Sequence, residues 1–340
     1  MTGLERAAGL HREQRLVVAH VDLPAELQLR RQYGEGGALL RDYLPQCRRA
    51  GIGVIIGAVF VHPAYLPDMA LTMGLEQIAA LYAEIEESGG AFKLVRTARE
   101  LDTCLSNGQI AILLSMEGCE PLGRSPVLLR VFSELGVRLL GLTWNHRTAA
   151  ADGCSEQGGG LTRMGRELVE QAWSLGMALD VSHLNDAGFD DLLSMGNGPV
   201  FASHSNCRTL CPHPRNLTDG QLKQLAARNG VAGVNQTRFL VREKDAALED
   251  LLAHVLYMEQ TAGPGFTGLG LDLARPYMEA LPRPHAVWKK WDPAEEDIFA
   301  DYEALYHLTA ALLDAGLNEP AVKGILGGNF LRFLRGALPP

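Results

Sequence analysis

The chain has 340 residues, of which 47% are hydrophobic and 21% are charged, and its formal net charge at pH 7 is −9. This composition supports a large buried core and excludes an intrinsically disordered chain. Because the charge is acidic and no long basic run occurs, we expect no nucleic acid and no anionic membrane surface as a partner, but a small molecule.

The cysteines and the first residues indicate the compartment. Six cysteines are spread along the chain and form no short disulfide framework, so reduced thiols are expected. The first residues carry charges where a secretory signal would be apolar, and no later segment is long and apolar enough to span a bilayer. The sequence therefore predicts a cytoplasmic protein.

Short apolar runs alternate with longer stretches of helical periodicity, which is typical of strand–helix units around a parallel sheet. Eight strands are predicted, over residues 16–20, 52–60, 110–116, 137–143, 177–182, 199–203, 230–235 and 266–271. Eight such strands predict an α/β fold of the distorted (β/α)8 TIM-like barrel type. No repeat or linker divides the chain, so we expect a single domain over residues 1–340.

Helices are predicted between these strands wherever apolar residues recur three or four positions apart. They begin at Gly74 and cover 164–175, 217–227 and 245–260. Thr218, followed by a glutamine three residues later, is typical of a capping box at a helix start. The proline-rich segment 276–292, which contains Trp288 and Trp291, is predicted to be a long loop.

Residues of metal-ligand or acid–base type stand where the predicted strands end. They are His20, Asp22, Glu117, His183, His204 and Asp272. The carboxyl ends of parallel strands converge in space, so residues far apart in the sequence can build one site there. The pattern indicates a metal-dependent hydrolase.

Each of these residues also has a simpler interpretation when it is taken alone. His20 and Asp22 point to the same side of an extended chain and can hold one ion, but a buried imidazole beside a loop aspartate gives the same pattern. Glu117 ends an apolar strand where a carboxylate needs a cation or donors, or it is a solvated loop residue. His183 and His204 follow neighbouring strands, although a single strand-end histidine is usually a core residue.

Taken together, these motifs resemble the renal (membrane) dipeptidase family, which are zinc peptidases with amidohydrolase-like barrels. The resemblance covers nearly the whole chain. Its motifs are His20-Val21-Asp22-Leu23-Pro24, Glu117-Gly118, Gly136 through Thr143, Asp180-Val181-Ser182-His183, Ser203-His204-Ser205, Arg215-Asn216 and Gly327 through Arg332.

The resemblance implies a site with two zinc ions. It makes His20 and Asp22 the ligands of one zinc, His183 and His204 the ligands of the other, and Glu117 the bridge between them. Two such ions share a hydroxide that forms near neutral pH and acts as the nucleophile.

The resemblance also assigns roles around the ions. Asp272 matches the family's acid–base aspartate, which takes a proton from the water and returns it to the leaving amine. Arg215 matches the arginine that holds a substrate carboxylate, and its planar guanidinium suits bidentate recognition of that group. A solvated loop arginine is the alternative for Arg215.

The family pattern breaks after the fourth predicted strand. The best-known members have a histidine directly after Leu-Thr that polarises the scissile carbonyl, and this chain has Trp144 there. His146 could point to the same side if the extended conformation continues, Asn145 could donate to the oxyanion, or the role could be absent. This departure concerns the substrate more than the metal.

The principal hypothesis is a zinc-dependent dipeptidase acting on small dipeptides, and the resemblance implies a homodimer. One alternative is a related binuclear metal amidohydrolase that cleaves an N-acyl amino acid or a lactam, with Trp144 lining the site for a different acyl group. The other alternative is a non-catalytic metal-binding scaffold protein, which would have no need for the proton carrier Asp272.

Overall fold

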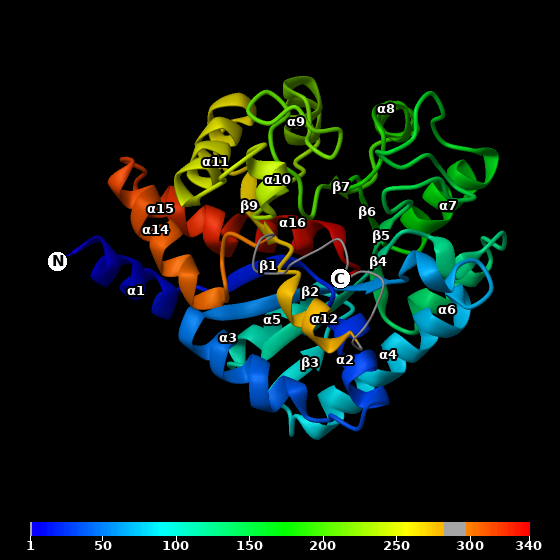
Figure 1. Cartoon of the computed structure of the whole chain (residues 1–340), viewed down its shortest axis with the longest axis horizontal. Coiled ribbons are helices and arrows are strands. Elements are labelled where there is room, and N and C mark those ends of the chain that lie inside the picture. Colours follow the sequence, from blue (N-terminus) through cyan, green and yellow to red (C-terminus); the bar gives the residue numbers. More distant parts are fainter. Residues whose placement is uncertain (1, 282–296) are drawn as a thin grey trace.

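The fold is taken from a computed structural model, which describes residues 2–281 and 297–340. At its centre lies a parallel sheet whose strands are surrounded by helices (Figure 1). The strands are β1 (Leu16–Val21), β2 (Ile52–Phe60), β3 (Phe92–Leu94), β4 (Ile110–Glu117), β5 (Val137–Gly141), β6 (Ala178–Asp180), β7 (Val200–Phe201), β8 (Ala232–Asn235) and β9 (Thr267–Leu271).

Eight of these strands form a ring in the order β7-β6-β5-β4-β2-β1-β9-β8. A parallel bridge between Ala202 and Ala232 joins the two ends of this order, since Ala202 N donates to Val231 O over 2.9 Å. The predicted barrel and its eight strands are confirmed. Strand β3 was not predicted, because it has three residues, pairs only with β4 and contains the exposed Lys93.

The register of the barrel brings the strand ends together. Glu117 pairs with Phe60 across β4 and β2, and His20 pairs with Leu271 across β1 and β9. On the other side of the ring, Asp180 of β6 pairs with Phe201 of β7. The residues that follow these positions therefore lie at one end of the barrel.

Helices on the outside of the ring connect the strands (Figure 1). They are α1 (Gly3–Glu13), α2 (Leu23–Gln32), α3 (Leu44–Ala50), α4 (Ala70–Glu87), α5 (Ala98–Ser106), α6 (Leu128–Glu134), α7 (Arg163–Ser174), α8 (Asp186–Ser194), α9 (Asp219–Ala227), α10 (Arg238–Val241), α11 (Leu248–Ala262), α12 (Arg275–Ala280), α14 (Leu305–Asp314), α15 (Glu319–Lys323) and α16 (Asn329–Ala337).

The predicted helices correspond to α4, α7, α9 and α11, and the capping box of α9 forms between Thr218 and Gln221. The loop predicted for 276–292 is wrong at its start, because α12 occupies Arg275–Ala280. Pro276 lies in the first turn of this helix, where the missing N–H costs no intrahelical hydrogen bond. Trp288 and Trp291 lie outside the described residues.

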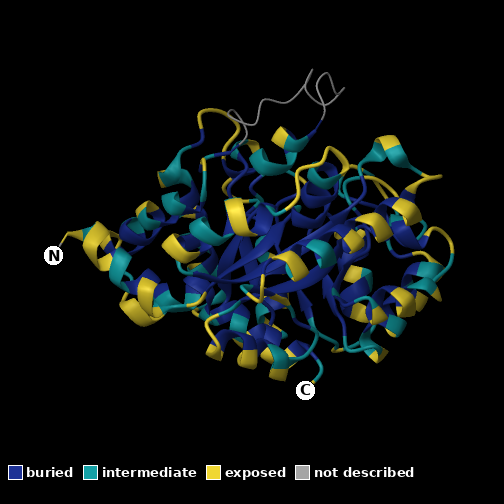
Figure 2. Cartoon of the chain, turned by 90° about the horizontal axis from the view of Figure 1, so that it is seen from below, coloured by how far each residue is buried: buried dark blue, intermediate teal, exposed yellow. Residues whose placement is uncertain are grey.

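The strands form the core of the molecule. Every residue of β1 and β2 is buried, and the exposed residues lie mainly on the surrounding helices (Figure 2). Helix α16 packs against the sheet through Phe330 and Phe333, whose ring centroids lie 6.4 and 5.2 Å from that of Phe201. A Cβ at Gly268 would meet Phe330 at 2.4 Å, so this close packing requires glycine. Within the described residues, no helix combines the length and the apolar character that crossing a membrane requires.

Candidate active site

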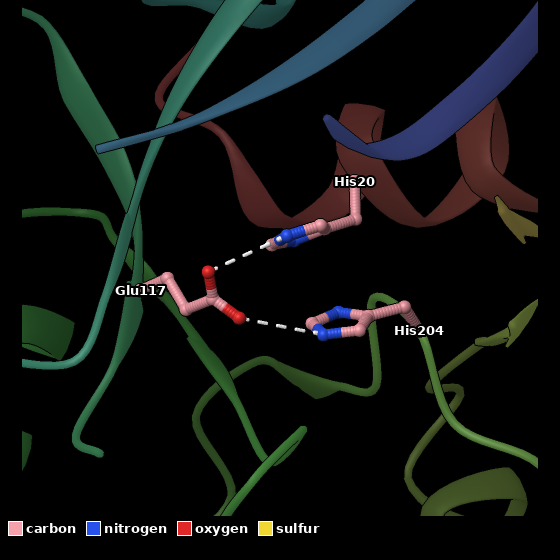
Figure 3. Close-up of side chains that lie close together, drawn as sticks. All are labelled: His20, Glu117 and His204. Atoms are coloured by element: carbon pink, nitrogen blue, oxygen red, sulfur yellow. Dashed lines mark ion pairs between the residues drawn. The ribbon is translucent and has the colours of Figure 1, made fainter. Parts of the chain in front are cut away.

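The side chains predicted from the strand ends converge on Glu117, the last residue of β4. Its Oε2 lies 3.5 Å from His20 Nε2, and its Oε1 lies 2.8 Å from His183 Nε2 and 3.4 Å from His204 Nε2. Figure 3 shows the Glu117 carboxylate between His20 and His204, with one oxygen directed to each ring. One carboxylate thus contacts imidazoles at the ends of three different strands.

Two aspartates complete the cluster. His20 Nε2 lies 3.7 Å from Asp22 Oδ1 and 3.8 Å from Asp272 Oδ1, and the other Asp272 oxygen lies 4.0 Å from His204 Nε2. Asn235 Nδ2 donates to Asp272 Oδ2 over 3.1 Å. Asp272 therefore lies between His20 and His204. Its side chain is the most accessible of the six, at 27% exposed.

Backbone strain is concentrated at the same strand ends. His183, Leu271 and Asp272 have φ angles of 71°, 64° and 61°, in the left-handed region. For a residue with a Cβ, this conformation costs about 1–2 kcal/mol. Such strain persists where surrounding contacts enforce it, which is common at functional sites.

Burial dominates the electrostatics of the cluster in the absence of bound ions. It raises the pKa of Glu117 to about 7 and also raises the pKa of Asp272. Burial, together with nearby positive groups that include Arg215, lowers the pKa values of His183 and His204 well below the usual range. Burial also acts to lower the pKa of His20, but the Glu117 and Asp22 carboxylates outweigh it and raise this pKa.

The outer nitrogens of two histidines have other partners. His183 Nδ1 lies 2.8 Å from Asn145 Oδ1, and since an amide oxygen can only accept, the histidine nitrogen is the donor. His204 Nδ1 lies 2.6 Å from Ser203 Oγ. The Nε2 atom of His183 is then left with a lone pair, and it faces His204 Nε2 across 2.9 Å.

Such a pair of nitrogens needs either a proton on His204 Nε2, which would then donate to His183 Nε2, or a cation nearby. Asp22 Oδ1 is likewise buried and has no hydrogen-bond partner among the described residues. Imidazoles and carboxylates form the ligand set that zinc prefers. Two groups of three residues each bring their ligand atoms within 4.8 Å of one another. One group is His20, Glu117 and His204, and the other is His20, Asp22 and Asp272. The residues present therefore fit metal ions.

Arg215 lies beside the cluster as a buried cation. It is 6% exposed, and its guanidinium donates to His204 O over 3.0 Å and to Ser205 Oγ over 3.4 Å. Among residues 2–281 and 297–340, no carboxylate lies within 4.0 Å of this guanidinium. A buried cation in this situation is suited to bind an anionic group of a ligand.

The loop after β5 contains the three residues considered for the missing histidine. The centroid of the Trp144 ring lies 6.2 Å from that of the His183 ring and 5.3 Å from that of the Phe60 ring. Asn145 uses its oxygen as an acceptor for His183. The His146 side chain is 64% exposed and lies 3.9 Å from Glu156, and no contact joins it to the cluster.

Strand β5 ends at Gly141, two residues earlier than predicted, and this explains the position of His146. The extended conformation does not continue to residue 146, and the His146 ring packs edge-on against the Trp144 ring, with the ring centroids 5.8 Å apart. Several contacts of the site were not predicted, namely the Asn145–His183 and Asn235–Asp272 hydrogen bonds and a contact chain from Asp180 through Ser203 to His204.

The fold and the site together define a class of protein. A closed parallel barrel whose carboxyl end holds three imidazoles and three carboxylates is the architecture of a metal-dependent hydrolase.

Residues 4–279 match the family described as membrane dipeptidase, peptidase family M19, and the chain belongs to this family. Dipeptidase verJ of Clonostachys rogersoniana is 29% identical over 278 residues, which cover 81% of this chain and 67% of the relative. The predicted resemblance is confirmed, and so is the assignment as a metal-dependent dipeptidase.

Solved structures of metallopeptidases have the same fold. The dipeptidase AC, of family M19, superposes with a TM-score of 0.84 at 26% identity, covering 96% of this chain and 99% of that structure. A metallopeptidase from Rhodobacter sphaeroides, liganded with a phosphinate mimic of the dipeptide L-Ala-D-Ala, has a TM-score of 0.82 at 26% identity, covering 95% of this chain and 99% of its own.

Proposed function

We propose that the protein is a zinc-dependent dipeptidase with two zinc ions at the end of its barrel. His20 and Asp22 would hold one ion, His183 and His204 would hold the other, and Glu117 would bridge them. The observation that carries this proposal is that the two oxygens of Glu117 are directed to different imidazoles, at 3.5 and 2.8 Å. When bound, the ions supply Lewis acidity that activates a water and polarises a carbonyl.

Asp272 is proposed as the proton carrier. Its carboxylate is the most accessible of the cluster and lies within 4.0 Å of both His20 and His204. Asp272 would take the proton from the attacking water and deliver it to the leaving amine, while Asn235 keeps the carboxylate in place.

Arg215 is proposed to bind the carboxylate of the substrate. Its guanidinium already donates to the backbone of the ligand His204, which fixes the distance between the anion site and the reacting groups. A substrate held in this way carries a free carboxylate next to the bond that is cut, as a dipeptide does. The dipeptide mimic bound to the Rhodobacter sphaeroides relative supports this substrate class.

A second candidate function follows from Trp144. This ring and Phe60 form an aromatic surface beside His183, where the best-known members of the family have a carbonyl-polarising histidine. Such a surface suits an apolar acyl group, so an N-acyl amino acid or a lactam is the alternative substrate. We propose Trp144 as the residue of this loop that contacts substrate, since His146 is exposed and Asn145 is bonded to His183.

The remaining proposals concern the whole chain. A single domain is supported by one hydrophobic cluster that contains residues from Leu10 to Leu326. A cytoplasmic location is supported by six cysteines without disulfide bonds, and a homodimer by the family resemblance alone. The position of Asp272 beside both His20 and His204 argues against a non-catalytic scaffold.

One assay tests the proposed reaction and its alternative. Chelated protein is restored with zinc and offered L-L dipeptides, L-D dipeptides, N-acyl amino acids and lactams in parallel. We expect hydrolysis of dipeptides, which stops on chelation and returns with zinc. Cleavage of only the N-acyl amino acids or lactams would favour the second candidate, and zinc-restored protein that cleaves none would sink both.

A further inference from the structure

A buried aspartate outside the cluster has no countercharge of its own. Asp180, the last residue of β6, is 6% exposed, and among the described residues no lysine, arginine or histidine lies within 4.0 Å of it. Its Oδ1 accepts from the backbone N–H groups of Ser182 and Ser203, over 2.9 and 3.0 Å. Its Oδ2 faces the Ser203 hydroxyl over 2.5 Å.

The Ser203 hydroxyl connects this aspartate to His204. Its oxygen lies 2.6 Å from His204 Nδ1 and 3.3 Å from Ser182 Oγ. A hydroxyl has one proton, and the carboxylate oxygen can only accept, so this proton is directed to Asp180. The serine oxygen is then free to accept from His204 Nδ1, which must carry its own proton.

We propose that Asp180 and Ser203 are positioning residues that fix the tautomer of His204. With the proton held on Nδ1, the lone pair of Nε2 is directed at Glu117 and at the space shared with His183. The inference rests on the ligand set of the proposed function and adds to it the residues that make His204 able to bind metal. The buried charge of Asp180 would act on the ion through Ser203 and the imidazole.

A single isosteric change reverses the direction of this chain of hydrogen bonds. In Asp180→Asn, the two backbone donors keep the amide oxygen at the Oδ1 position, so the NH2 group faces Ser203 Oγ and donates to it. The serine proton then turns to His204 Nδ1, which is closer at 2.6 Å than Ser182 Oγ at 3.3 Å. His204 would carry its proton on Nε2, the atom that has to bind the metal.

The experiment measures zinc binding and the tautomer, in addition to activity. Zinc affinities of the full chain are determined by competition with a chromophoric chelator, and the tautomer of His204 is read from nitrogen chemical shifts of the metal-free protein. In Asp180→Asn we expect the zinc held by His183 and His204, called the second zinc, to bind about 10- to 100-fold more weakly. The first zinc, held by His20 and Asp22, should bind almost as before. Ser203→Ala, which removes the connection itself, is expected to weaken the second zinc in the same direction.

Ser182→Ala is the matched control. Ser182 is also buried, and its hydroxyl accepts from the backbone of His204 over 3.1 Å but does not contact the imidazole. This variant should keep the second zinc and the Nδ1–H tautomer. If Asp180→Asn does not fold, as judged by circular dichroism, Ser203→Ala alone carries the test.

The proposal is overturned if every folded variant among Asp180→Asn and Ser203→Ala binds the second zinc as tightly as the wild type. It is also overturned if His204 of the wild type carries its proton on Nε2. Wild-type protein that binds two zinc ions but cleaves no dipeptide would contradict the proposed function and leave this inference intact.

Discussion

His183 and His204 direct their Nε2 atoms at each other across 2.9 Å while their Nδ1 atoms are bonded elsewhere. His183 Nε2 presents a lone pair to His204 Nε2, so this contact needs either a proton on His204 Nε2 or a cation. The same two nitrogens lie 2.8 and 3.4 Å from one oxygen of Glu117, so the arrangement is prepared for a cation.

Replacement of Glu117 by glutamine should affect both ion positions. The amide removes the negative charge that two cations would share and replaces one acceptor by a donor. We expect the zinc content of the purified protein to fall from two ions per chain to fewer than one, as measured by atomic emission. Glu120→Gln is the control, because this carboxylate lies three residues after Glu117 but makes no contact with the three imidazoles. Equal zinc loss in both variants would contradict the bridging role.

Replacement of Asp272 by asparagine should separate proton transfer from metal binding. Removal of a general acid–base group typically lowers the rate by about 10²- to 10⁴-fold. We expect kcat to fall in this range while both zinc ions stay bound, since His20, Asp22, Glu117, His183 and His204 remain. Steady-state kinetics and zinc analysis on the same preparation check this. A variant that loses zinc would instead place Asp272 among the ligands.

Arg215→Lys should weaken the binding of substrates that have a free carboxylate. The charge remains, but the planar fork that binds a carboxylate bidentately is lost. We expect kcat/KM for dipeptides to fall about 10- to 100-fold, corresponding to charge-assisted hydrogen bonds of roughly 1.5–3 kcal/mol. Arg208→Lys, on the same loop but paired with Asp186, should cost much less. For a dipeptide amide, which lacks the carboxylate, Arg215→Lys should leave kcat/KM almost unchanged. An equal loss of kcat/KM for the amide and the dipeptide would contradict carboxylate binding by Arg215.

His11 should make the stability of the protein depend on pH, far from the metal cluster. Burial lowers its pKa from 6.5 to about 4, and its ring nitrogens lie 2.8 Å from Ala50 O and from Thr309 Oγ1. The unfolded chain therefore binds a proton at a higher pH than the folded protein. The stabilisation is fully present above pH 6.5 and is lost as the pH falls toward 4, by up to roughly 3 kcal/mol.

Comparison with His11→Asn isolates this contribution, because all other titrating groups are the same in both proteins. Chemical unfolding of the metal-free proteins at several pH values gives the difference in free energy of unfolding. We expect the wild type to be more stable near pH 7.5 and the difference to shrink as the pH falls to 4. A difference that is constant across this range would show that His11 does not titrate as described.

The sequence allowed the barrel and the six cluster residues to be predicted for a physical reason. Parallel strands that are buried on both faces appear as continuous apolar runs, and His20, Glu117 and Asp272 stand where such runs stop. Their convergence then follows from the closure of the ring. Family resemblance added the roles of these residues, which position alone could not provide.

The hydrogen bonds around the cluster could not be predicted in the same way. Whether Asn145 donates or accepts depends on which ring nitrogen of His183 is within reach, and the two residues are 38 positions apart. The position of His146 could not be predicted, because β5 ends at Gly141, two residues before the predicted end, and the chain after it is not extended. Asp180 and Ser203 lie inside recognised motifs, but the direction of their hydrogen bonds becomes visible only in three dimensions.

We propose that two zinc ions at Glu117 enable the protein to hydrolyse dipeptides. The most direct test is the rate of dipeptide hydrolysis by metal-stripped protein as zinc is added in known amounts per chain. We predict negligible hydrolysis without zinc and a rate that rises to a plateau at two zinc ions per chain. Full activity in the stripped protein, or no hydrolysis at any amount of zinc, would contradict the claim.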